Sequence, residues 1–152
     1  MTHAADQRRG FVTVEIAGQL FGIAIERVRE VFAPERITRV PLSGEEIAGV
    51  LNLRGRIVTA IDMRVRLGRP RSDPSATRMA IGVEKSHEDF ALLVDRPGDV
   101  IEMDVSAIEP TPATLDKSWH VFVEGVYRLE DRLMLILDVD RAIGGDELAD
   151  AA

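Results

Sequence analysis

The sequence predicts a mainly β fold made of two related halves, and three observations support this prediction. A twenty-residue segment recurs without a gap 76 residues later, short apolar runs are frequent, and the few helical signals are brief. Recurrence within one chain indicates a duplicated architecture, and apolar runs of about five residues suit strands better than helices. The length of 152 residues fits one ordinary domain or two small subdomains that share a core.

The repeat aligns residues 49–68 with residues 125–144. Most aligned positions are apolar in both copies, and the identical ones are Gly49/Gly125, Val50/Val126, Leu53/Leu129, Arg56/Arg132, Asp62/Asp138 and Gly68/Gly144. A weaker similarity aligns residues 21–31 with residues 90–100 at an offset of 69. Two barrels of about 65 residues would each be marginal, so we expect an apolar seam that keeps the halves together.

Four of the predicted strands lie in two pairs of segments. Residues 11–16 and 20–25 are expected to form a hairpin around a turn at 17–19. The apolar runs 57–61 and 133–137 are expected to be strands buried on both faces.

The predicted helices are short. Ser43 and Glu46 have the capping-box spacing, which predicts one or two helical turns before Ile47. Asp62 and Asp138 each follow an apolar run and precede a segment that ends in glycine, which predicts two short helices with aspartate N-caps.

Composition limits the function classes. The chain contains no cysteine, which excludes disulfides and thiolate metal sites, and no apolar run has the roughly 18 residues of a membrane span. The net charge of −7 argues against nucleic-acid binding by the chain as a whole. We therefore expect a cytoplasmic protein with a single domain over 10–145, a disordered tail over 1–9 and a flexible acidic tail over 146–152.

The charge is distributed unevenly. Residues 1–78 carry 13 basic and 9 acidic side chains, whereas residues 79–152 carry 6 and 17, so the net charges are +4 and −11. This asymmetry favours complementary faces for partners or for copies of the chain that meet head to tail. The alternative is a chance distribution combined with an acidic tail.

Catalysis has one candidate pair of residues. Asp62 and Asp138 occupy equivalent positions, and two pseudo-symmetric carboxylates could share a proton in a hydrolase. The residues that follow them are not the hydroxyl residue and glycine of aspartic proteases, which favours helix capping. His3, His87 and His120 lack metal-ligand spacing, so we expect no catalytic residue, metal or cofactor.

A basic stretch runs from Arg54 to Arg71. A solvated protein face explains it more simply than RNA binding, because stacking aromatic residues are scarce. A β-barrel nucleic-acid-binding protein nevertheless remains the alternative function, ahead of the hydrolase.

The two copies differ at one turn. It reads Asn52-Leu53-Arg54-Gly55 in the first copy and Arg128-Leu129-Glu130-Asp131 in the second. Glycine permits a positive φ, which would leave the Arg54 guanidinium free to project toward a partner's carboxylate or carbonyl. An ordinary exposed hairpin arginine explains the pattern equally well.

The segment 49–58, followed by Asp62, resembles the signature of the CheW family of chemotaxis coupling proteins. The resemblance covers residues 10–145. It implies two packed SH3-like five-stranded β-barrels with a few short helices and no enzymatic activity. Two positions depart from the family pattern: Thr59 replaces a common proline, and Pro97 replaces an aliphatic residue, which is expected to disturb strand geometry in the second barrel.

The resemblance also implies partners. Family members bridge the regulatory domain of a CheA-type histidine kinase and the cytoplasmic tip of methyl-accepting chemoreceptors, and they join ring assemblies in membrane-associated receptor arrays. Val28 and Glu30 match positions associated with receptor contact, and Asn52, Leu53, Arg54 and Gly55 match the region implicated in kinase coupling.

Overall fold

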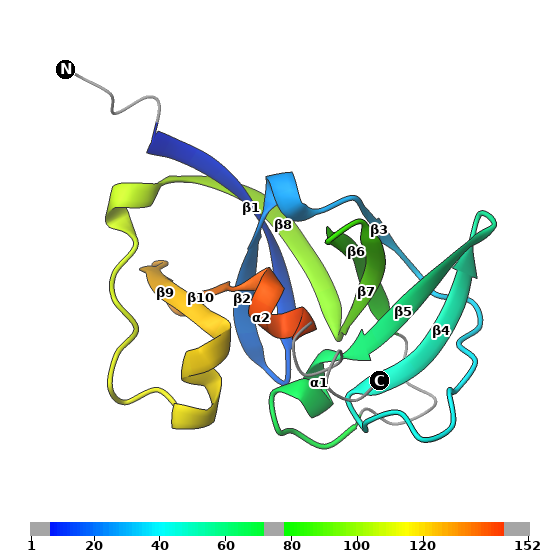
Figure 1. Cartoon of the computed structure of the whole chain (residues 1–152). Helices are drawn as coiled ribbons and strands as arrows, with labels where there is room; N and C mark the ends of the chain where they lie inside the picture. Colours follow the sequence, from blue (N-terminus) through cyan, green and yellow to red (C-terminus); the bar gives the residue numbers. More distant parts are fainter. Residues whose placement is uncertain (1–6, 72–77, 145–152) are drawn as a thin grey trace.

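Two five-stranded β-sheets form the body of the protein. The structure is a computed structural model, and it describes residues 7–71 and 78–144 (Figure 1). The first sheet has the order β8 (Arg96–Asp104), β1 (Arg8–Ile16), β2 (Gln19–Ala24), β10 (Leu133–Leu137) and β9 (Val123–Arg128). The second has the order β3 (Glu30–Phe32), β6 (Met79–Lys85), β7 (Glu88–Val94), β5 (Arg56–Asp62) and β4 (Ile47–Leu53).

Each sheet curls into a barrel around its own small core. In the first sheet, which we call barrel A, a β-bridge between Glu109 and Val126 brings the segment after β8 onto β9. In the second sheet, barrel B, the bridge between Thr38 and Val50 brings the segment after β3 onto β4. The predicted mainly β class with two five-stranded barrels is confirmed.

The helices are all short. They are η2 (Ile25–Arg27), α1 (Met63–Arg66), η3 (Val105–Ala107), η4 (Lys117–Phe122) and α2 (Val139–Ile143). Asp62 Oδ1 accepts hydrogen bonds from the amides of Arg64 and Val65, and Asp138 Oδ1 accepts one from Arg141. The two predicted aspartate N-caps are therefore confirmed.

The strand registers confirm the duplication. In barrel B, Thr59 lies opposite Phe90 in the parallel pair β5–β7, and in barrel A, Leu135 lies opposite Phe21 in the parallel pair β10–β2. These partners are related by the offsets of 76 and 69 that the sequence comparison gave. The two barrels are thus structural copies.

The barrels do not coincide with the sequence halves. Barrel A combines β1 and β2 with β8, β9 and β10, whereas β3 to β7 form barrel B, so the last three strands of each copy lie in the other barrel from its first two. The net charges of the halves therefore do not describe the barrels. Residues 8–28 and 95–144 (barrel A) carry 8 basic and 13 acidic side chains, and 29–71 and 78–94 (barrel B) carry 11 and 8, giving −5 and +3.

An apolar seam joins the barrels, as expected. Its buried residues come from both sheets, including Val14 and Phe21 of barrel A and Ile61 and Leu92 of barrel B. Trp119 of η4 closes one side, and its indole nitrogen donates to the carbonyl of Leu67 at 2.8 Å. Since apolar burial contributes about 25 cal/mol per Å², a shared seam stabilises barrels that would be marginal alone.

Three local predictions need correction. Residues 43–46 form turns rather than a helix, because Ile47 pairs with Ile61 and the Ser43 hydroxyl donates to Val40 instead of capping. Ile57 is 67% exposed rather than buried, because β5 begins beyond the seam. β1 starts at Arg8, inside the predicted tail, through pairing with β8, while residues 1–6 and 145–152 lie outside the described residues.

Pro97 lies in barrel A, not in a second barrel formed by the C-terminal half. It faces Val14, and the register between β1 and β8 shifts next to it. The Thr13 hydroxyl donates to the carbonyl of Asp99 at 2.6 Å across this irregularity. A β-bulge accommodates proline because it leaves one residue outside the ladder, so the predicted disturbance is local.

Candidate docking site at the open end of barrel B

The β4–β5 hairpin projects from barrel B and ends in a two-residue turn (Figure 1). Arg54 and Gly55 both have positive φ, 55° and 84°, as the type I′ turn of a right-twisted hairpin requires. The side-chain oxygen of Asn52 accepts a hydrogen bond from the Gly55 amide at 2.8 Å. Asn52 and Gly55 therefore fix the turn that presents Arg54.

Arg54 does not project freely into solvent. Its guanidinium donates two hydrogen bonds to the carboxylate of Glu30 on β3, at 2.9 and 2.7 Å. The hydrogen bonds and the charge of Glu30 raise the pKa of Arg54, so this cation stays charged at any physiological pH. The Arg54 side chain is 73% exposed and that of Glu30 is 25% exposed, which leaves the outer face of the guanidinium open to a partner.

Two hollows lie beside this ion pair, and Glu30, Phe32, Leu53 and Arg54 line both. The smaller, about 290 Å³, is lined in part by apolar side chains that include Phe90. Two more ion pairs stand at its rim, Arg29–Glu84 and Arg56–Asp89. The larger, about 530 Å³, lies between β4 and the segment after β3.

This combination suits protein recognition. Apolar side chains such as Phe32 and Leu53 lie here beside paired charges. Protein interfaces have a similar make-up, with an apolar core and a polar rim, and arginine and aromatic residues contribute most to their affinity. The open end of barrel B, defined as the Glu30–Arg54 pair with its two hollows, is therefore the candidate docking site.

The structure brings together residues that the sequence had assigned to two different contact sets. Glu30, from the predicted receptor contacts, binds Arg54, from the predicted kinase contacts. Leu53 packs partly against the core of barrel B. Val28 follows η2, is half-buried against the seam, and lines neither hollow.

Sequence reasoning missed most of the lining of the hollows, including Phe32, Glu84, Asp89 and Phe90. The available signal was the alternation along β3, which places Glu30 and Phe32 on the same face. Glu84, Asp89 and Phe90 had no local signal, because β6 and β7 reach the site only through the sheet order.

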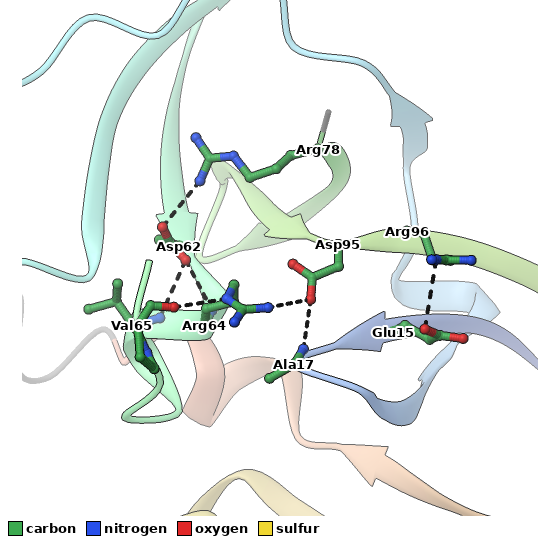
Figure 2. A network of polar contacts seen from close by, with 9 residues as sticks. Glu15, Ala17, Asp62, Arg64, Val65, Arg78, Asp95 and Arg96 are labelled. Atoms are coloured by element: carbon green, nitrogen blue, oxygen red, sulfur yellow. Dashed lines mark hydrogen bonds and ion pairs between the residues drawn. The ribbon is translucent and has the colours of Figure 1, made fainter. Parts of the chain in front are cut away.

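Asp62 and Asp138, the candidate catalytic pair, both have structural roles. Asp62 is 2% exposed, with Oδ1 used for capping and Oδ2 accepting from Arg78 at 3.1 Å (Figure 2). Asp138 caps α2 in the other barrel. Each carboxylate therefore has a structural partner of its own. Among residues 7–71 and 78–144, no group of three or more His, Asp or Glu side chains could hold a metal ion.

The basic stretch is engaged within the chain. Its arginines bind carboxylates or backbone carbonyls: Arg54 binds Glu30, Arg56 binds Asp89, Arg64 binds Asp95, Arg66 binds Ala142, Arg69 approaches Asp116 and Arg71 binds Glu45. Arginines held in this way are poorly placed to neutralise phosphates, which supports the interpretation as a protein face.

Comparisons with known proteins agree with this fold. A family model described as a CheW-like domain matches residues 10–147. A chemotaxis protein CheW of Bacillus subtilis is 30% identical over 84% of this chain and 82% of its own, and a probable chemotaxis protein CheW of Rhizobium etli is 29% identical over 87% and 85%.

A solved structure gives the same result. The scaffolding protein TtCheW of Thermoanaerobacter tengcongensis superposes with a TM-score of 0.76 and 34% identity over 86% of this chain and 88% of its own. Within the part of the chain that the structure describes, no helix has the length and apolarity to cross a membrane. These findings support a chemotaxis coupling adaptor and give no support to nucleic-acid binding or hydrolysis. The chain belongs to the CheW family.

Proposed function

We propose that this protein is a non-enzymatic adaptor that couples methyl-accepting chemoreceptors to the regulatory domain of a CheA-type histidine kinase. It acts in the cytoplasm, at membrane-associated receptor arrays. The family membership and the relatives' names support the chemotaxis role. The opposite net charges of the barrels, −5 and +3, support head-to-tail contacts in self-assembled or mixed rings with the kinase.

The site assignments follow from the family positions that these residues match, and the contact between Glu30 and Arg54 is the observation that links the two sites. We assign Asn52, Leu53, Arg54 and Gly55 to the kinase, and Val28 and Glu30 to the receptor. Because Glu30 and Arg54 share two hydrogen bonds, a partner that draws Arg54 outward also changes the carboxylate that the other partner meets. This contact gives the adaptor a direct physical link between its two tasks.

Calorimetric titration with the regulatory domain of a CheA-type kinase tests the kinase site. Arg54→Glu should weaken binding by about tenfold, the scale of a lost charge-assisted contact. The matched control is Arg128→Glu, because Arg128 is similarly exposed and binds Glu109 in barrel A through the same carboxylate chemistry. It should leave the affinity unchanged. Equal weakening by both variants would indicate general electrostatics and would overturn the assignment of Arg54.

A charge swap separates recognition from the integrity of the turn. The double variant Glu30→Arg/Arg54→Glu can re-form an ion pair between β3 and the turn with the opposite polarity. It should keep the thermal stability of the parent while losing kinase binding as Arg54→Glu does.

Receptor binding, measured by co-sedimentation with receptor-containing membranes, should fall in Glu30→Ala. Receptor binding as strong in Glu30→Ala as in the parent would contradict the receptor role of Glu30.

A further inference from the structure

The chain crosses between the barrels at two places, and an ion pair lies at each crossing. The first crossing, from β2 to β3, contains Arg27, and the second, from β7 to β8, contains Asp95. Arg27 binds Asp140 of α2, and Asp95 binds Arg64 of α1. Each crossing is thus tied to one of the two short helices that follow β5 and β10.

The Asp95 junction connects three segments (Figure 2). Asp95 Oδ2 accepts hydrogen bonds from Arg64 Nη1 and from the Ala17 amide, both at 2.7 Å. The Asp95 amide donates to the carbonyl of Glu15 at 3.0 Å. Arg64 belongs to α1 of barrel B, whereas Glu15 and Ala17 belong to the β1–β2 hairpin of barrel A. The side chains of Arg64 and Asp95 are only 25% and 26% exposed, so water weakens this contact less than it weakens an open surface pair.

The Arg27 junction differs in one respect: its ion pair with Asp140 lies within barrel A, and its hydrogen bond to the carbonyl of Glu84 reaches barrel B. Arg27 Nη2 donates to Asp140 Oδ1 at 2.7 Å and to the carbonyl of Glu84 at 3.2 Å. Asp140 lies on α2 of barrel A, and Glu84 lies on β6 of barrel B. The hydrogen bond from Arg27 lowers the pKa of Asp140. Positions 64 and 140 are equivalent at the offset of 76, and positions 15 and 84 at the offset of 69, yet the helix residue is a cation in one copy and an anion in the other.

We infer that Arg27, Asp140, Arg64 and Asp95 are positioning residues that set the angle between the two barrels. The seam between the barrels is mostly apolar, and apolar burial is less directional than hydrogen bonding. Two other polar contacts join the barrels away from the crossings, from Trp119 to the carbonyl of Leu67 and from Arg66 to the carbonyl of Ala142. Charge-assisted hydrogen bonds have narrow distance and angle requirements. Arg64–Asp95 joins the barrels at one crossing, and at the other Arg27, held by Asp140, donates to the carbonyl of Glu84; together they fix the rotation and thereby the relative placement of surfaces on the two barrels.

Spin labels can measure this angle directly, because the chain has no cysteine of its own. Cysteines introduced at Leu42 of barrel B and Asp131 of barrel A, both exposed, carry the labels. In the double variant Arg27→Ala/Arg64→Ala, the distance distribution between the labels should shift or broaden. The control Arg96→Ala removes a nearby exposed ion pair with Glu15 and should leave the distribution unchanged. An unchanged distribution in the double variant would overturn the inference.

Two further variants separate positioning from simple loss of fold. Arg64→Lys keeps the charge toward Asp95 and should retain the parental distribution. Asp95→Asn keeps an oxygen for the Ala17 amide but loses the charge, and should broaden the distribution while the far-ultraviolet circular dichroism stays parental. Broadening accompanied by loss of the β-sheet spectrum in Asp95→Asn would count against a positioning role.

The consequence for binding rests on the proposed function. The double variant should bind the kinase domain alone with parental affinity, but should form the ternary complex with receptor and kinase at least about fivefold more weakly, because linked sites bind together only when their geometry matches. If the parent protein itself fails to bind the kinase, the proposed function fails and the label distances still decide the role of the junctions. Parental ternary affinity in a variant with broadened distances would refute the link between angle and function.

Discussion

The open ends of the two barrels differ although their frameworks match. In barrel B, two hydrogen bonds join Arg54 to the carboxylate of Glu30. The equivalent positions in barrel A are Asp99 and Glu130, two carboxylates. Barrel A instead places its arginine at position 128, equivalent to Asn52, where it binds Glu109. The duplication therefore preserved the strands and the helix caps, while the charges at the open ends became different.

The two turns also differ in backbone conformation at the equivalent positions. The barrel B turn uses positive φ at Arg54 and Gly55, whereas neither Glu130 nor Asp131 has a positive φ. Glycine tolerates that region at no steric cost, and aspartate tolerates it less well. One glycine thus distinguishes the hairpin that presents an arginine from the hairpin that does not.

The largest expected difference between the barrels is the loss in free energy of unfolding when each of the two equivalent capping aspartates is replaced. Asp62→Ala should destabilise the protein by about 3 kcal/mol, because it removes a cap and leaves Arg78 without its buried partner. Asp138→Ala should cost about 1 kcal/mol, the scale of a cap alone. Urea unfolding of both variants provides the measurement. Equal costs would show that the Asp62–Arg78 pair adds nothing to capping.

A smaller effect should distinguish the two turns. Gly55→Ala should destabilise the protein by about 1 kcal/mol, because the φ of 84° strains any residue with a Cβ. Space does not limit the substitution, since no atom lies within 4 Å of the added Cβ. Asp131→Ala should leave the stability almost unchanged. Thermal unfolding of both variants provides the measurement. A neutral Gly55→Ala would mean that the barrel B turn can adopt the conformation of its counterpart.

The smallest effect should appear in the pH dependence of the barrel A helix. Asp140 has a lowered pKa in the folded state, so its contribution to stability is present above its ordinary pKa and is lost as the pH falls through the lowered value. Arg27→Ala should therefore reduce stability at pH 7, and the part of the difference from the parent that depends on Asp140 should disappear in acid, while the part due to the hydrogen bond with the carbonyl of Glu84 should remain. A difference of the same size at pH 7 and below about pH 2 would exclude this ionic origin.

Several features were predictable from the sequence because they depend on neighbours along the chain. The hairpin at 11–25 and the two aspartate caps at 62 and 138 follow from local rules of turn and helix chemistry. The turn at 52–55 was identified because its aligned copy differs. The docking site was only half predictable: Glu30 and Arg54 were each selected, but their contact was not, because it depends on how β3 lies relative to the β4–β5 hairpin.

The sequence by itself determined the duplication, the strand composition, the caps and the resemblance to the CheW family, since these are properties of order and spacing. Only the tertiary structure decided that the first two strands of each copy pair with the last three strands of the other copy. Offsets of 76 and 69 are the same whether each copy pairs within itself or with the other, so the repeat could not distinguish the two arrangements. Glu30 and Arg54 belong to the same copy, and only the packing of β3 beside the β4–β5 turn placed Arg54 against a carboxylate of its own chain instead of leaving it free for a partner.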